Sequence, residues 1–293
     1  MPLVPPGRPH RRRRRRLLAG LPVVALLLAA CSGPSGPDGG TASGGTTANS
    51  SAGARLPLEQ PRTRCRGPAT EATLVRFASA DGTSLDGVLV GDGPAGVVLV
   101  HEYPDDLCGS WPVADYLAKR GLRAFAIDLR CFGLSDCPGG DARGRVIDDV
   151  AAAVAELRRR GVTTVALIGA SMGGAAVLIA GTRVRPSVAA VVSVSGKADP
   201  TDLVGGIPLN AGAAVGQLTA PTMLVVATND SITSVEETRV IHRAVKSGDK
   251  RLTVLSGRFD GQHGWQLLYD PSEEKPTSVA ADVAAFLTAH TRD

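Results

Sequence analysis

Short runs of consecutive apolar residues recur along the chain from residue 96 onward. Runs of this length with no polar interruption are typical of strands that are buried on both faces of a sheet. The segments between them are predicted to be helices, two of which end at Gly121 and Gly161. The pattern predicts strands at 96–101, 122–128, 165–169, 188–194, 222–227 and 252–255, and helices at 113–120, 146–160, 175–181, 234–246 and 278–289.

Two runs with alternating apolar and polar residues precede the first buried strand. They span 73–78 and 84–91 and flank Asp81 and Gly82, so they predict an antiparallel hairpin. Strands that alternate with helices after such a hairpin imply an α/β domain with a mostly parallel central sheet and helices on both faces. In sheets of this kind, ligands bind at the carboxyl ends of the strands. Candidate catalytic residues are therefore expected just after each apolar run.

Residues 1–30 are predicted to be a secretory signal peptide. Arg8 and the run 11–16 precede an apolar stretch at 17–30, which is shorter than the roughly 20 residues of a membrane span. The stretch ends in Leu-Ala-Ala and then Cys31, which resembles the lipobox of bacterial lipoproteins. The resemblance implies cleavage before Cys31 and lipid attachment to its thiol. The alternative is ordinary signal cleavage, with Cys31 incidental.

The segment 31–55 is rich in Gly, Ser and Thr, has almost nothing to bury, and is predicted to be a flexible tether. Residues 56–293 are long enough for one domain with a sizeable core. We therefore expect an exported lipoprotein that is anchored to the cell membrane and faces the extracytoplasmic side.

The net charge argues against nucleic acid as a partner. The whole chain is formally +4, but residues 1–30 contain seven arginines and no acidic residue, so their removal leaves about −3. No further Arg/Lys patch interleaved with aromatic residues follows.

Four cysteines follow Cys31, an even number that favours two disulfides in an oxidising compartment. Three pairings are open. We favour Cys131–Cys137, which closes a short loop, and Cys65–Cys108, which ties down the N-terminal segment of the domain. The alternative is four free, buried thiols. A metal site is not expected, because no Cys-x-x-Cys motif or histidine pair has ligand spacing.

The strand predicted at 165–169 leads into Gly-Ala-Ser-Met-Gly-Gly at 169–174. Gly-x-Ser-x-Gly between a buried strand and a helix is the pattern of a nucleophile elbow. The serine occupies a strained turn, and glycine is needed on both sides because side chains would collide there. The pattern predicts Ser171 as a nucleophile; the alternative is a structural glycine-rich turn.

A serine nucleophile requires a base, and that base requires an acid. Of the five histidines, His263 is the one in a loop after the last strand, where the base is expected. Asp230 follows the strand at 222–227, and the order Ser, Asp, His is that of nucleophile-elbow hydrolases. Asp199 and Asp202, after the preceding strand, are the alternative acids.

Two further segments resemble the α/β-hydrolase family. His101-Glu102 stands where its members often have His-Gly, and 128–135 is similar to its Asp-x-Arg-Gly-x-Gly-x-Ser loop, with Cys131 in place of glycine. The resemblance implies the α/β-hydrolase fold and an oxyanion hole formed by the backbone N–H groups of Met172 and Glu102. The connection after residue 194 has about 27 residues, so no large cap domain is expected.

These residues together predict a serine hydrolase that cleaves carboxylic esters of small or exposed substrates. The reaction needs no metal and no organic cofactor. The alternatives are an acyltransferase or peptidase with the same triad, or a surface-binding lipoprotein without catalytic activity.

Overall fold

The computed structural model describes Cys65 and residues 72–292. The predicted signal peptide (1–30), Cys31 and the tether (31–55) lie outside the described residues. Within the described part of the chain, no helix has both the length and the apolar character that a membrane span requires.

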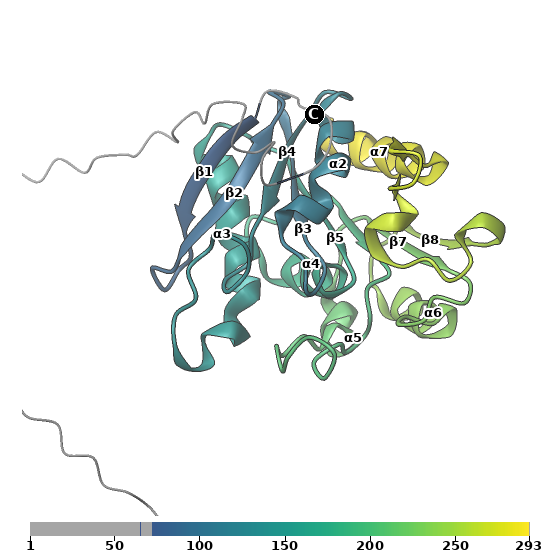
Figure 1. Cartoon of the computed structure of the whole chain (residues 1–293). Coiled ribbons are helices and arrows are strands. Elements are labelled where there is room, and N and C mark those ends of the chain that lie inside the picture. Colours follow the sequence, from purple (N-terminus) through teal and green to yellow (C-terminus); the bar gives the residue numbers. More distant parts are fainter. Residues whose placement is uncertain (1–64, 66–71, 293) are drawn as a thin grey trace, which may run out of the picture. The chain divides into compact units, whose positions relative to one another are not determined.

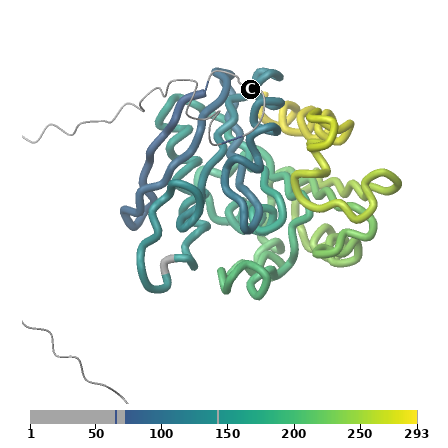
Figure 2. The backbone as a smooth tube through the Cα atoms, in the orientation of Figure 1, coloured from purple at the N-terminus to yellow at the C-terminus, as the bar shows by residue number. Residues whose placement is uncertain are grey.

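An eight-stranded sheet lies at the centre of the described domain, in the order β1-β2-β4-β3-β5-β6-β7-β8 (Figure 1). Within it, β2 runs antiparallel to β1 and β4, and the other neighbouring pairs are parallel. Figure 2 shows the N-terminal hairpin at one end of the sheet and β7 and β8 at the other. The strands are β1 (Ala72–Ala78), β2 (Ser84–Val90), β3 (Ala95–Val100), β4 (Leu122–Ile127), β5 (Val165–Ala170), β6 (Val191–Val194), β7 (Thr222–Ala227) and β8 (Lys250–Leu255).

Helices cover both faces of the sheet, and each face has its own apolar core (Figure 1). Val98 and Val100 of β3 belong to the core under α3 and α4, whereas Val97 and Leu99 belong to the core under α2 and α7. This alternation explains why the strands are continuously apolar. The helices are α2 (Leu107–Ala118), α3 (Val146–Arg159), α4 (Met172–Arg183), α5 (Ala211–Ala214), α6 (Val235–Ala244) and α7 (Ser278–Thr291).

Every predicted strand and helix is present, and the α/β prediction with a mostly parallel sheet is confirmed. The largest error concerns α2, which starts at Leu107 and not at residue 113. Asp106 caps this helix by accepting the N–H of Cys108, and the N–H of Leu107 donates to Asp128 in the loop after β4. The helix therefore begins before Pro112, at a position set partly by a contact with a different segment.

The connection between β6 and β7 holds α5 and a 3-10 turn at Val215–Gln217 as its regular structure within the described residues. It therefore adds no large helical layer over the carboxyl ends of the strands. A short antiparallel ribbon of β9 (Tyr269–Asp270) and β10 (Lys275–Pro276), which was not predicted, follows the loop that carries His263.

Both predicted disulfides, Cys65–Cys108 and Cys131–Cys137, are present. Cys65–Cys108 ties the segment before β1 to α2, as expected from the sequence. Cys131 has a φ of 66°, in the left-handed region where glycine is the usual residue. The Cys131–Cys137 bond closes the loop that follows β4.

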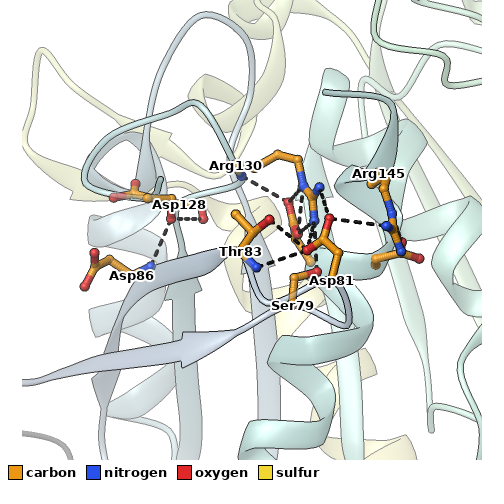
Figure 3. A network of polar contacts seen from close by, with 10 residues as sticks. Ser79, Asp81, Thr83, Asp86, Asp128, Arg130 and Arg145 are labelled. Atoms are coloured by element: carbon orange, nitrogen blue, oxygen red, sulfur yellow. Dashed lines mark hydrogen bonds and ion pairs between the residues drawn. The ribbon is translucent and has the colours of Figure 1, made fainter. Parts of the chain in front are cut away.

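A buried arginine holds this loop against α3 (Figure 3). The Arg130 guanidinium lies 2.6 Å from Asp149 and 2.8 Å from Asp81, and it donates to the Ser79 hydroxyl. The side chains of Arg130 and Asp149 are both fully buried. A buried charge needs such partners, because transfer out of water is costly for an unpaired ion.

Candidate active site

Ser171 lies between β5 and α4 in a backbone conformation that few residues other than glycine adopt. Its φ and ψ are 50° and −113°. A Cβ atom at Gly169 would lie 2.3 Å from the carbonyl oxygen of Gly173, and one at Gly173 would lie 2.1 Å from that of Val100. Neither site can accept a side chain, so both glycines are required for the turn. The turn has the geometry that the elbow pattern predicts.

Backbone contacts set Ser171 beside the ends of the two neighbouring strands. Its N–H donates to the carbonyl oxygen of Val194, the last residue of β6, over 2.9 Å. On the other side, Gly173 packs against the carbonyl groups of Val100 and His101 at the end of β3. Ser171 therefore lies at the carboxyl edge of the sheet, between the loops after β3 and β6.

His263 and Asp230 form a close pair at the same edge. The Nδ1 atom of His263 lies 2.9 Å from both carboxylate oxygens of Asp230. Asp230 also accepts the N–H groups of Ile232 and Thr233, at 2.9 and 3.0 Å. Burial opposes ionisation of Asp230, but these hydrogen bonds outweigh it and lower its pKa. Asp230 is therefore a carboxylate at neutral pH.

The other nitrogen of His263 is available for chemistry. Its Nε2 atom is buried and has no hydrogen-bond partner among the described residues. With Nδ1 donating to Asp230, a neutral ring carries its lone pair on Nε2. This is the tautomer that can accept a proton from a hydroxyl group.

The alternative acids lie elsewhere. Asp199 is exposed and accepts the N–H and the hydroxyl of Thr201, and Asp202 is also exposed. Asp260, close to His263 in sequence, accepts the hydroxyl of Thr228. The geometry therefore favours Asp230 as the partner of His263.

Ser195, which was not singled out from the sequence, connects the β6 edge to the histidine loop. Its buried hydroxyl accepts the N–H of Gly264 over 3.1 Å. Its carbonyl oxygen accepts the hydroxyl of Thr233, which lies three residues after Asp230. The sequence signal that could have identified Ser195 is its position as a small polar residue directly after an apolar run. Its partner 69 residues away in the chain was not visible in the sequence.

His101 supports the loop after β3. The ring is fully buried, its Nε2 lies 3.2 Å from the N–H of Leu129, and its Nδ1 lies 2.9 Å from the carbonyl oxygen of Glu102. The network assigns the proton to Nδ1, because Nε2 must accept. Burial lowers the pKa of His101, so the ring stays neutral. Its structural role explains its position at the strand end.

The Glu102 carboxyl group turns toward the histidine loop. A Cβ atom at position 264 would lie 1.7 Å from its Oε2 atom, so this carboxyl group occupies the space left free by Gly264. Oε2 is buried and has no hydrogen-bond partner among the described side chains and backbone. Burial raises the pKa of Glu102 to about 7, and the charge of His263 acts against this shift.

The two tryptophans of the chain belong to the apolar core. Trp111 and Trp265 are both buried in the core shared with α2 and α7. Met172 is also buried, whereas Tyr103 and Ile232 are exposed near Glu102 and Asp230 in the chain. Over the described ranges, no group of three or more His, Cys, Asp or Glu side chains could hold a metal ion.

Residues 93–215 match the family described as serine aminopeptidase, S33. Similar solved structures include an esterase from Pyrococcus furiosus, with 21% identity and a TM-score of 0.63 over 76% of this chain and 92% of that chain. An α/β hydrolase from Penicillium sp. sh18 has 18% identity and a TM-score of 0.63, over 75% and 99% of the two chains. A monoacylglycerol lipase from Paleococcus ferrophilus has 18% identity and a TM-score of 0.57, over 70% and 99%.

No curated protein sequence matches the chain significantly. The solved structures, at this level of identity, bear on the fold alone. They share the fold of the described domain, and the family match covers β3, the elbow and α4. The described domain therefore has the α/β-hydrolase fold, and residues 93–215 are similar to one family of that fold.

Proposed function

We propose that this chain is a serine hydrolase that cleaves carboxylic esters of small or exposed substrates outside the cytoplasm. Ser171 is the nucleophile, His263 the general base and Asp230 the residue that orients His263. The observation that carries this proposal is the His263–Asp230 pair, with Nε2 unpartnered, at the sheet edge where Ser171 occupies its strained turn. A histidine that pairs with a carboxylate through Nδ1 and has an unpartnered Nε2, at the sheet edge that also carries a strained serine, is expected of an acyl-transfer site.

The reaction follows from these roles. The Ser171 hydroxyl oxygen attacks the ester carbonyl carbon while His263 Nε2 takes the hydroxyl proton. The negative charge on the carbonyl oxygen is stabilised by the backbone N–H groups of Met172 and Glu102. The C–O bond to the alcohol breaks as His263 returns the proton to the leaving oxygen. Water then repeats the sequence on the acyl-enzyme and releases the acid.

Support for esters as substrates comes from the similar structures, which include an esterase and a monoacylglycerol lipase. The connection from β6 to β7 contains α5 and one 3-10 turn, and this supports access for exposed substrates. Peptides are the second candidate, because the matching family is described as a serine aminopeptidase. The same triad performs both reactions on a carbonyl carbon.

The test uses the purified protein without residues 1–31. We expect stoichiometric labelling by a fluorophosphonate and turnover of p-nitrophenyl esters. A panel should compare acetate, butyrate and decanoate esters with aminoacyl p-nitroanilides. Higher kcat/KM for the short esters supports the proposal, and higher kcat/KM for the anilides identifies a peptidase. A folded protein that neither becomes labelled nor turns over any substrate contradicts both.

We further propose that the protein is lipid-anchored through Cys31 on the extracytoplasmic side. The support is the apolar stretch at 17–30 that ends in a lipobox-like sequence, followed by a polar segment. In a bacterium that processes lipoproteins, the full chain should incorporate an alkyne fatty acid. Incorporation should persist in Ser32→Ala and disappear in Cys31→Ala. An exported parent protein that incorporates no fatty acid would refute the anchor.

A further inference from the structure

The backbone directly after His263 is held by two side chains from separate strand ends. Ser195, after β6, accepts the N–H of Gly264 over 3.1 Å. The carboxyl group of Glu102, after β3, lies against the same backbone, with Oε2 in the space that a Cβ atom at Gly264 would fill, and the backbone N–H of Trp265 favours its ionised form. Two side chains that contribute no atom to the proposed triad therefore contact the backbone of the histidine loop.

Glu102 is packed too closely to be an incidental neighbour. Its carboxyl group fills the position that a side chain at 264 would occupy, and Gly264 itself has a φ of 58°. One oxygen, Oε2, is buried with no hydrogen-bond partner among the described residues. A buried and unpartnered carboxylate oxygen is costly, whereas a protonated carboxyl group avoids most of that cost.

The charges around Glu102 come from three segments. Asp105 is in the same loop, Asp230 follows β7, and His263 is in the loop after β8. The two carboxylates oppose ionisation of Glu102, and a positive charge on His263 favours it. The charge of Glu102 is therefore coupled to the charge that His263 acquires when it takes a proton.

We propose that Glu102 and Ser195 are positioning residues that hold the backbone directly after His263 in place, and that the charge state of Glu102 makes this positioning dependent on pH. The inference rests on the proposed function, because the positioned group is the proposed base. When ionised, Glu102 attracts the Trp265 N–H and stabilises the imidazolium form of His263. When protonated, it does neither. Because burial raises the pKa of Glu102 to about 7, both states occur near neutral pH.

The first experiment compares kcat/KM of the parent with that of Glu102→Gln from pH 5.5 to pH 8.5. Glutamine keeps the size of the side chain and one carbonyl oxygen but carries no charge. Dividing kcat/KM of the parent by kcat/KM of the variant removes the effect of ionisations that both proteins share. We expect this ratio to rise about tenfold with increasing pH, with a midpoint near 7 and with the change in kcat and not in KM.

Two matched variants separate charge from hydrogen bonding. Ser195→Ala removes a neutral acceptor, so its kcat should fall about 2- to 10-fold by a factor that is constant across pH. Asp105→Asn removes a neighbouring charge that opposes ionisation of Glu102. Its pH profile should keep the Glu102 inflection and shift it to lower pH. A flat ratio of parent to Glu102→Gln would overturn the proposal.

A stability measurement tests the same group without hydrolysis. A carboxyl group with a raised pKa in the folded state stabilises the fold while it is protonated. That contribution is present at pH 4.5 and is lost as the pH rises to about 7. The Tm of the parent minus that of Glu102→Gln should therefore fall over this range and then level off. Parallel Tm curves for the parent and Glu102→Gln would overturn the pH-dependent positioning by Glu102. If the Tm curves are as expected but the fluorophosphonate does not label the protein, only the proposed hydrolase activity is contradicted.

Discussion

Replacing Ser171 with alanine is expected to lower kcat for the best ester substrate by about 10⁴- to 10⁶-fold. The loss is large because the variant lacks the oxygen atom that attacks the substrate. The φ of 50° at Ser171 directs one particular side chain out of the turn between β5 and α4. KM should change much less than kcat, since the variant removes only the attacking oxygen atom. Steady-state kinetics and fluorophosphonate labelling measure both effects.

The matched control is Ser231→Ala. Ser231 is an exposed serine directly after Asp230, so it lies near the proposed triad in the chain. Its replacement should leave labelling and kcat within about twofold of the parent, as is usual for surface substitutions. Retention of labelling in a folded Ser171→Ala protein would place the nucleophile elsewhere and refute the proposed mechanism.

Replacing Asp149 with alanine is expected to lower the free energy of unfolding by about 3–5 kcal/mol. The substitution leaves the guanidinium of Arg130 buried, with its fully buried partner removed. Asp81, 2.8 Å away and partly exposed, compensates in part. Three donors that Arg130 directs at Asp149, the backbone N–H among them, also lose this acceptor. Urea unfolding with the disulfides intact measures the change.

Asp148, the preceding residue on α3, is the control. It pairs with Arg145 at the surface over 2.8 Å, and both side chains are substantially exposed. Asp148→Ala should therefore cost no more than about 1 kcal/mol. The double variant Arg130→Met/Asp149→Leu, which removes both charges, should recover part of the loss caused by Asp149→Ala. If Asp148→Ala and Asp149→Ala lower the free energy of unfolding equally, the buried Arg130–Asp149 pair contributes no more to stability than the surface pair.

The strands were predictable because each is apolar over its whole length. The run 222–227 coincides with β7, and the other predicted strands of the parallel part differ from the observed ones by up to three residues at an end. Continuous apolarity is a local property, so it needs no knowledge of the fold. The start of α2 was wrong by six residues, because Asp128 from another segment binds its first N–H group.

The candidate site likewise has some features that the sequence predicts and others that only the tertiary structure shows. Ser171, Asp230 and His263 could be proposed from the sequence because each follows an apolar run, and the ends of parallel strands meet at one edge of the sheet. The choice of Asp230 over Asp199 depended on which carboxylate lies 2.9 Å from the His263 ring, and this distance is a tertiary property.

By itself, the sequence determined the order of elements, the strained turn at Ser171 and the residues available as base and acid, because these follow from local periodicity and residue type. Only the tertiary structure decided that Glu102 and Ser195 hold the loop after His263. Those contacts join residues far apart in the chain, and they depend on the order in which β3, β5 and β6 lie in the sheet. The raised pKa of Glu102 also depends on the tertiary structure, since burial is set by the residues that pack around a group and not by its neighbours in sequence.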